Sequence, residues 1–110
     1  MRYILNSAVI TSPGSYQYRL LYIHQAIEWL NEGKFKSTIG YEETAYAMSK
    51  IFDIVIPVNR CTITMKSGDE ALVFRLVFPP GTPRISPENK GMLTTQFILE
   101  NCEIGLLTKK

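Results

Sequence analysis

The order of apolar and polar residues predicts short strands and one helix in the first third of the chain. Residues 2–11 alternate between two sides in the manner of a strand, and Ser, Pro and Gly in "TSPGS" then predict a turn. A second strand is expected in "YQYRLLYI", residues 16–23. In "IHQAIEWLNEGK" apolar residues recur at helical spacing, and Gly33, just past the last of them, predicts a left-handed cap that ends the helix.

The middle of the chain predicts another strand and helix. A short strand is expected from Phe35 to Ile39, followed by a helix over residues 41–52 with an apolar face. Glu42 and Glu43 fall in the first turn of this helix, where the helix dipole favours negative charge.

A β-hairpin is expected in the second half. Two alternating runs flank the polar stretch "KSGDE" at residues 66–70, whose glycine suits a hairpin turn. A proline-rich loop follows, and Ser86 and Pro87 predict a short helical turn within it. The closing "CEIGLLTKK" predicts an edge strand. Together these elements predict an α+β fold in a single domain, residues 1–110, with a small mixed β-sheet flanked by helices.

Composition indicates a soluble folded protein and limits its ligands. Hydrophobic residues make up 45% and charged residues 20% of the chain, which is typical of a globular domain. The net charge of +2 is too small to favour binding of long nucleic acids along a basic stripe, but it is compatible with a small anionic ligand.

The two cysteines, Cys61 and Cys102, lie in alternating sequence outside any CxxC pair, and we expect buried free thiols. No metal-like cluster of side chains is visible in the sequence, so no metal or cofactor is expected. The opening apolar run is too short for a signal peptide, and no run approaches the roughly 20 apolar residues of a membrane span. We therefore expect no membrane association and a cytoplasmic location.

Four stretches in order resemble a known family. They are "ILNSAV" at the start, "IGYEETAYAMS" in the middle, "PVNR" leading into "SGDEALVFRL", and "EIGLL" at the end. Their order and spacing resemble the YddF-like family, whose archaeal-virus members are anti-CRISPR ring nucleases that cleave cyclic tetra-adenylate. The resemblance implies a homodimer whose subunits close over a cyclic oligoadenylate in a groove at their interface.

The chain departs from the pattern of the active family members at both positions usually given catalytic roles. Tyr41 stands where those members carry a histidine, and aligning "VFPPG" with their Arg-Leu-Pro-Glu-Gly loop puts Pro80 at the glutamate and Val77 at the arginine. A phenol with an unperturbed pKa of about 10 is hardly ionised at neutral pH, and proline has no titratable side chain. Tyr41 is thus a doubtful catalyst, although its hydroxyl can donate a hydrogen bond to a phosphate.

The groups that suit ligand binding are better represented. Backbone N–H groups and the dipole at a helix start favour an anion, and neighbouring polar side chains can add hydrogen bonds and charge. The expected ligand-binding residues are Asn6, Ser7, Gly40, Tyr41, Thr44 and Arg60.

Structural roles compete with each of these assignments. Asn6 and Ser7 could instead cap a bend in the first strand, and Tyr41 could pack against the sheet. Arg60 could pair with Asp69 or Glu70 across the hairpin turn. His24 is expected to be a partly exposed helix residue, and Arg75 is expected to face the other side of its strand from its apolar neighbours.

Three functional hypotheses follow from this sequence. In the first, a phage or mobile element encodes a protein that binds and sequesters a cyclic oligonucleotide second messenger of prokaryotic antiviral immunity, with little or no cleavage, in the host cytoplasm. In the second, the protein is an active metal-independent ring nuclease that uses Tyr41, His24 or the geometry of the substrate alone. In the third, the ancestral groove has become a protein-interaction surface with no nucleotide ligand.

Overall fold

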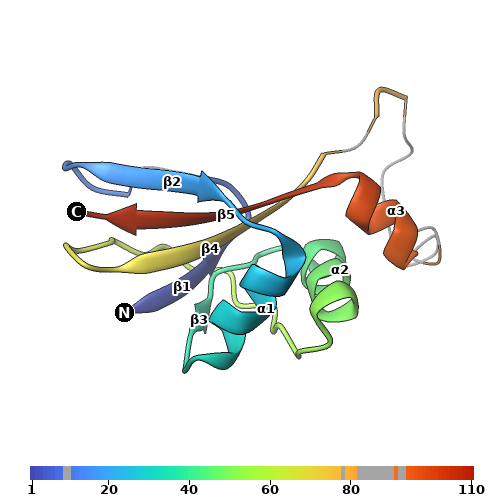
Figure 1. Ribbon diagram of the computed structural model, residues 1–110, viewed down its shortest axis with the longest axis horizontal. Coiled ribbons are helices and arrows are strands. Elements are labelled where there is room, and N and C mark those ends of the chain that lie inside the picture. Colours follow the sequence, from blue (N-terminus) through green and yellow to red (C-terminus); the bar gives the residue numbers. More distant parts are fainter. Residues whose placement is uncertain (9–10, 78, 82–90, 92–93) are drawn as a thin grey trace.

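The computed structural model describes residues 1–8, 11–77, 79–81, 91 and 94–110, and within them it forms a mixed sheet flanked by helices (Figure 1). The elements in chain order are β1 (Arg2–Leu5), β2 (Tyr16–Leu20), α1 (Ile23–Asn31), β3 (Lys36–Ser37), α2 (Glu42–Phe52), β4 (Glu70–Leu76), α3 (Thr95–Glu100) and β5 (Cys102–Lys109). The strand order is β2-β5-β4-β1-β3. β1 is parallel to β3 and β4, whereas β5 is antiparallel to β4 and β2. The predicted α+β class is confirmed.

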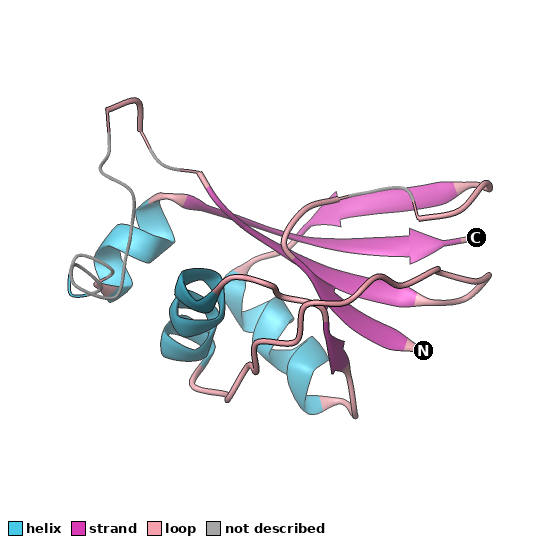
Figure 2. Ribbon diagram, turned by 180° about the vertical axis from the view of Figure 1, so that it is seen from behind, coloured by secondary structure: helices cyan, strands magenta, loops and turns pink. Residues whose placement is uncertain are grey.

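The two faces of the sheet are covered differently. Helices α1 and α2 lie against one face (Figure 1), where Trp29 and Met48 join Phe74 in the larger apolar cluster. The other face carries Tyr3, Leu5, Ala71, Val73 and Leu107, and it is covered by Ile63 and Met65 from the segment between α2 and β4 (Figure 2). The sheet is therefore a middle layer, with helices on one side and an extended segment on the other.

Strand β4 is central because both of its faces are apolar. Ala71, Leu72, Val73 and Phe74 are fully buried in succession, as expected for a strand that is covered on both sides. Its edges are occupied by β1 and β5. Because both edges of β4 are occupied, residues 59–65 cannot pair with it, and the predicted hairpin is wrong. The Lys66–Asp69 turn does form, with the Asp69 N–H donating to the Lys66 carbonyl at 2.9 Å, but residues 59–65 do not pair in the sheet.

Two other predictions about chain ends and caps are wrong. β5 lies between β4 and β2 instead of at the edge, because its Ile104, Leu106 and Leu107 are buried from both faces. The C-cap residue of α1 is Glu32, which has right-handed geometry, so the left-handed cap predicted at Gly33 does not form. A left-handed residue, Asp53, caps the other helix, α2.

Most of the other predicted strands and helices are confirmed. The strands at 16–20 and 36–37 and both helices are confirmed, while α3 was not foreseen. The strand predicted over residues 2–11 is confirmed only as far as Leu5, because the chain bends at Asn6 and Ser7; residues 9 and 10 lie outside the described part. The helical turn predicted at Ser86 and Pro87 also lies outside the described residues.

The cysteines are free, but their predicted burial is wrong for Cys61, which is exposed, and incomplete for Cys102. Burial raises the pKa of the Cys102 thiol. No helix among the described residues is both long and apolar enough to cross a bilayer.

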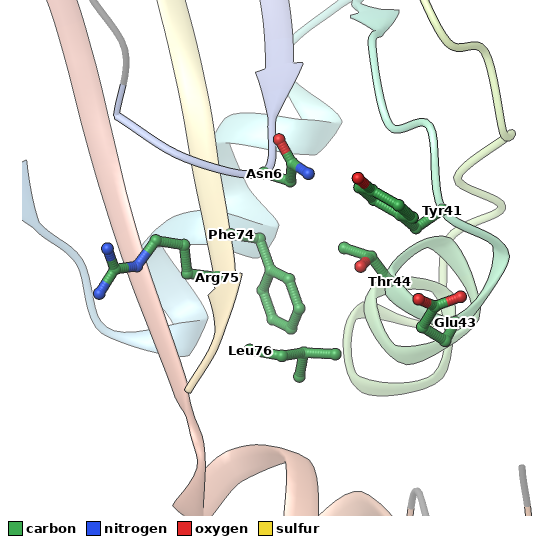
Figure 3. A pocket seen from close by; sticks show the side chains of 7 residues that line it. All are labelled: Asn6, Tyr41, Glu43, Thr44, Phe74, Arg75 and Leu76. Carbon is green, nitrogen blue, oxygen red and sulfur yellow. The ribbon is translucent and has the colours of Figure 1, made fainter. Parts of the chain in front are cut away.

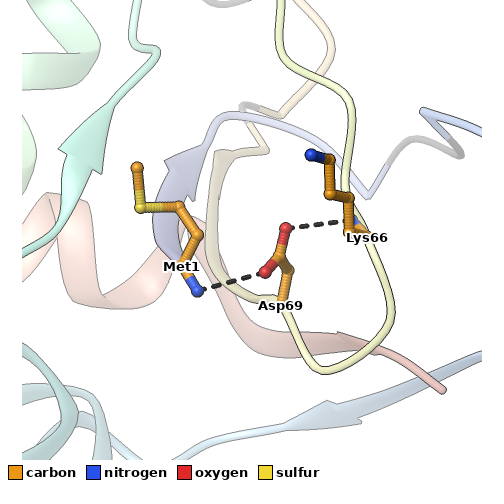
Figure 4. Close-up of polar contacts among 3 residues, drawn as sticks. All are labelled: Met1, Lys66 and Asp69. Atoms are coloured by element: carbon orange, nitrogen blue, oxygen red, sulfur yellow. Dashed lines mark hydrogen bonds and ion pairs between the residues drawn. The ribbon is translucent and has the colours of Figure 1, made fainter.

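The buried carboxylate of Asp69 stabilises the turn that precedes β4 (Figure 4). Asp69, with 8% of its surface exposed, accepts hydrogen bonds from the Lys66 N–H at 2.9 Å and from the Met1 amine at 3.1 Å. The Lys66 N–H in the first place, and the Met1 amine in addition, hold the pKa of Asp69 below its ordinary value. The same carboxylate thus joins the start of β1 to the start of β4, which are neighbours in the sheet.

Replacing Asp69 with Asn should lower the free energy of unfolding by about 1.5–3 kcal/mol at neutral pH, the usual contribution of hydrogen bonds to a charged group. Because the folded-state pKa is depressed, this stabilisation is present above the ordinary carboxyl pKa of 3.8 and is lost as pH falls through the folded value. Urea denaturation from pH 7 to pH 2.5 measures the effect. Asp53→Asn, at an exposed left-handed position that Asn also tolerates, is the matched control. A constant difference between Asp69→Asn and wild type across this pH range would contradict the assignment.

Candidate ligand-binding site

The carboxyl ends of three parallel strands meet at one end of the sheet. Asn6 follows β1, Thr38 follows β3, and β4 ends at Leu76. Because these strands run in the same direction, the residues that follow them gather at the same edge, which is where ligands bind in many open sheets. Helix α2 begins at this edge, with Tyr41 as its N-cap residue.

The first pocket lies between this edge and the start of α2 (Figure 3). It is a cavity of about 230 Å³, lined by Asn6, Tyr41, Glu43, Thr44, Phe74, Arg75 and Leu76. In Figure 3 the Tyr41 hydroxyl and the Asn6 amide point toward one another across the cavity, while the Arg75 guanidinium points away from it. Arg75 reaches instead toward Glu103, with Nε 3.9 Å from Oε2, and so faces away from Phe74 and Leu76 as expected from its strand.

Arg60 lies beside the first pocket because the preceding residue fixes its backbone. Asn59 donates from its backbone N–H to the Ile39 carbonyl and from Nδ2 to the Ser37 carbonyl, both at 2.8 Å. The aliphatic stem of Arg60 then covers Gly40, since a Cβ built on Gly40 would lie 2.8 Å from Arg60 Cγ. The guanidinium carbon is 5.8 Å from the centre of the Tyr41 ring.

The alternative prediction, an ion pair of Arg60 with Asp69 or Glu70, is therefore wrong, because neither pair occurs among the described residues. The partners of Asp69 are the Met1 amine and the Lys66 N–H, and Arg60 packs on the loop that enters α2. Tyr41 likewise does not pack into the sheet, because 45% of its surface is exposed.

Charges of both signs lie at the first pocket. Arg60 and the positive end of α2 favour an anion near Gly40 and Tyr41, and Tyr41 itself makes no side-chain hydrogen bond to cap the helix. Glu43, in the first turn of the helix, adds a carboxylate to the lining. The arrangement can thus hold a phosphate near Arg60 and accept hydrogen bonds from donor groups at Glu43.

A second pocket adjoins the first at Asn6. It is a cavity of about 280 Å³, lined by Leu5, Asn6, Ser7, Thr11, Thr38, Cys61, Thr62 and Ile63. Ser7 therefore belongs to this second pocket, whereas Tyr41 and Thr44 line the first and Asn6 lines both. Gly40 and Arg60 flank the first pocket without being among its lining residues.

Two residues of this site were missed by sequence reasoning. Glu43 was assigned only to the helix dipole, although its position in the first turn could have indicated a site residue. Asn59 stands directly before Arg60 in "PVNR", but nothing in the sequence indicates that it binds β3. His24 lines neither pocket and stacks on Tyr22 with ring centres 5.8 Å apart. No group of metal-ligating side chains occurs within the described ranges.

The fold and pockets define a small mixed-sheet protein with a polar site at the carboxyl ends of its parallel strands. The chain belongs to the STIV B116-like family, whose model matches residues 2–99.

Two relatives and one solved structure support this membership. The chain is 36% identical over 109 residues to the uncharacterized protein YddF of Bacillus subtilis (strain 168), covering 96% of this chain and 94% of YddF. It is 40% identical over 76 residues to the uncharacterized protein 26 of Sulfolobus islandicus filamentous virus (isolate Iceland/Hveragerdi), covering 66% of this chain and 64% of that protein. The structure of B116 of Sulfolobus turreted icosahedral virus has the same fold, with a TM-score of 0.72, 15% identity and 97% of each chain covered. The family thus includes viral proteins.

Replacing Gly40 with Ala should displace Arg60 without unfolding the protein. The added methyl would lie 2.8 Å from Arg60 Cγ and 3.2 Å from Arg60 Cβ, so Arg60 must change rotamer, and the free energy of unfolding should fall by about 1–3 kcal/mol, the usual cost of overpacking. Nuclear magnetic resonance of the Arg60 Nε–H and the Tyr41 ring protons measures the lost contact. Gly33→Ala, whose methyl would come no closer than 3.4 Å to Arg2, is the control. Unchanged Arg60 and Tyr41 signals in Gly40→Ala would show that the two side chains do not pack together in solution.

Proposed function

We propose that this protein binds and sequesters a cyclic oligonucleotide second messenger of prokaryotic antiviral immunity, with little or no cleavage. The observation that carries the proposal is the packing of Arg60 on Gly40 and Tyr41 at the start of α2, beside a pocket that also contains Asn6. A guanidinium next to a helix N-terminus suits a phosphodiester. The protein would then act by stoichiometry, lowering the free concentration of the messenger.

The residues at the site favour binding over turnover. Metal-independent ring cleavage requires a ribose 2′-hydroxyl to attack phosphorus and an acid to protonate the departing 5′-oxygen, steps that a group titrating near neutrality assists. No histidine lines either pocket among the described residues, and Tyr41 offers a phenol in place of an imidazole. Acid–base assistance is commonly worth roughly 10²–10⁴ in rate, so its loss would leave little cleavage.

A slow ring nuclease is the second candidate, and Glu43 is the observation that favours it. Its carboxyl group lines the same pocket as Tyr41, which places a second group capable of general acid–base catalysis at the site. This group was not part of the family pattern, in which the acid falls at Pro80.

A second copy of the chain is the proposed partner. Each pocket is smaller than the roughly 300–1,000 Å³ of typical ligand sites, so a ring of several nucleotides needs further surface to enclose it. Apolar side chains available for such a contact are exposed, including Tyr22 at 74% and Leu20 at 66%.

A homodimer should have a mass of twice 12.5 kDa in light scattering on a sizing column. The measurement is repeated from low to high micromolar concentration, with and without cyclic tetra-adenylate. A monomer under all of these conditions would remove the shared groove from the proposal.

Arg60→Ala should weaken binding of cyclic tetra-adenylate by about 1.5–3 kcal/mol, the range for a charge-assisted hydrogen bond. Calorimetry on wild type and variant measures the loss. Arg19→Ala, which removes an exposed arginine from β2, is the control and should bind as wild type does.

A separate incubation tests whether the ring stays intact. Wild type should return cyclic tetra-adenylate intact after long incubation, as followed by chromatographic separation of ring and linear product. Rapid cleavage that is abolished in Glu43→Gln would favour the nuclease, and absence of binding in a screen of cyclic nucleotides would reject both candidates.

A further inference from the structure

The second pocket differs from the first in its chemistry. Its described lining residues include no charged and no aromatic side chain. Hydroxyl groups come from Ser7, Thr11, Thr38 and Thr62, and the Asn6 amide forms the boundary with the first pocket. Leu5 and Ile63 supply an apolar part of the wall. The pocket is therefore neutral and rich in hydrogen-bonding groups.

Some of these polar groups hold the pocket together, and others are available to a ligand. Thr38 Oγ1 donates to the Ile4 carbonyl at 2.7 Å, and Thr11 Oγ1 accepts from the Met65 N–H at 2.8 Å. The side chains of Asn6, Ser7 and Thr62 make no hydrogen bond within the described part of the chain. Ser7 is half-buried and Thr62 is exposed, so both hydroxyls face solvent in the free protein, and a ligand hydroxyl can replace the water that they bind there.

The three parts of a nucleotide have different requirements, and only one of them fits this pocket. A phosphate is favoured by positive charge, which lies beside the first pocket at Arg60. A base is favoured by an exposed aromatic ring on which to stack, and Tyr41 in the first pocket offers one, whereas Phe74 in the same lining is fully buried. A ribose is an uncharged group with hydroxyls that both donate and accept, which matches the side chains of Ser7 and Thr62.

We propose that the second pocket holds a ribose of the bound nucleotide, and that Ser7 and Thr62 hydrogen-bond its 2′-hydroxyl. This inference rests on the proposed function and adds the selectivity of the site for ribose over deoxyribose. Sugar and phosphate are covalent neighbours, and the two pockets meet at Asn6, so one nucleotide unit spans both. The site then prefers a ribonucleotide ring over its deoxyribose counterpart, because the 2′-hydroxyl is the group that distinguishes them.

The first experiment compares cyclic tetra-adenylate with its all-2′-deoxy counterpart by calorimetry. Wild type should bind the ribose ring about tenfold more tightly, the equivalent of one or two net hydrogen bonds to the 2′-hydroxyl. Ser7→Ala and Thr62→Val remove one protein hydroxyl each while nearly preserving shape, and together they should reduce the preference to about twofold or less. Thr64→Val, an exposed threonine of the same segment that does not line the pocket, is the matched control.

A second measurement reports occupancy of the pocket without depending on affinity. Cys61 lines the pocket and is exposed, so a bound ribose should slow its alkylation by iodoacetamide severalfold. Cys102 in β5 does not line the second pocket and is the internal control, whose slower labelling should not change. Peptide mass spectrometry after timed labelling quantifies both cysteines in the same sample.

The outcomes separate this inference from the function on which it rests. If both rings bind equally and Cys61 is alkylated at the same rate with and without ligand, the ribose pocket is wrong and the binding function stands. If the ribose preference is present but survives in the Ser7→Ala, Thr62→Val double variant, the assignment of these two hydroxyls is wrong. If neither ring binds, the proposed function and the ribose pocket fall together.

Discussion

Strand β4 is paired along both edges and buried on both faces, and this constraint determines where the other elements lie. Its parallel pairing with β1 sets the direction of that strand, and β1 in turn pairs with β3 in the same direction. The carboxyl ends of β1 and β3 are therefore brought to the end of the sheet at which β4 finishes. Asn6 and Thr38, which follow these strands, lie at this end of the sheet for this reason, where Asn6 lines the first pocket beside Tyr41 and Thr38 lines the second.

The segment between α2 and β4 has a structural and a functional role because it is excluded from the sheet. Ile63 and Met65 cover the face away from the helices, which leaves Cys61 and Thr62 to form a wall of the second pocket. Earlier in the segment, Asn59 binds the backbone of β3 and its neighbour Arg60 covers Gly40. Pairing of this segment with β4 as a hairpin would have displaced β1 or β5 and removed these contacts.

Local patterns in the sequence predict the elements well and their neighbours poorly. The helical spacing in α1 and α2 and the alternation in β2 depend on residues a few positions apart, which is why these elements were predicted. The alternation of Ile63 and Met65 with threonines correctly indicated burial of one side, but burial against a sheet face produces the same pattern as pairing within the sheet. The apolar run from Ala71 to Phe74 did contain the missing information, since four successive buried residues indicate a central strand.

The candidate site likewise combines residues that the sequence predicts with contacts between distant segments that it does not. Asn6, Tyr41 and Thr44 line one pocket, and their link to Gly40 and Arg60 depends on hydrogen bonds between Asn59 and β3 that join distant parts of the chain. The consequence for a ligand follows from charge. Arg60 attracts an anion to the Tyr41 ring, whereas the Glu43 carboxylate in the pocket lining repels one, so a simple inorganic anion gains little from this pocket as a whole. A ligand that joins a single phosphodiester charge to hydroxyl or amino donors complements both Arg60 and Glu43. It also avoids the larger negative charge that a terminal phosphate would bring toward the Glu43 carboxylate. An internal phosphodiester flanked by sugar hydroxyls, as in an oligonucleotide ring, has this combination of groups.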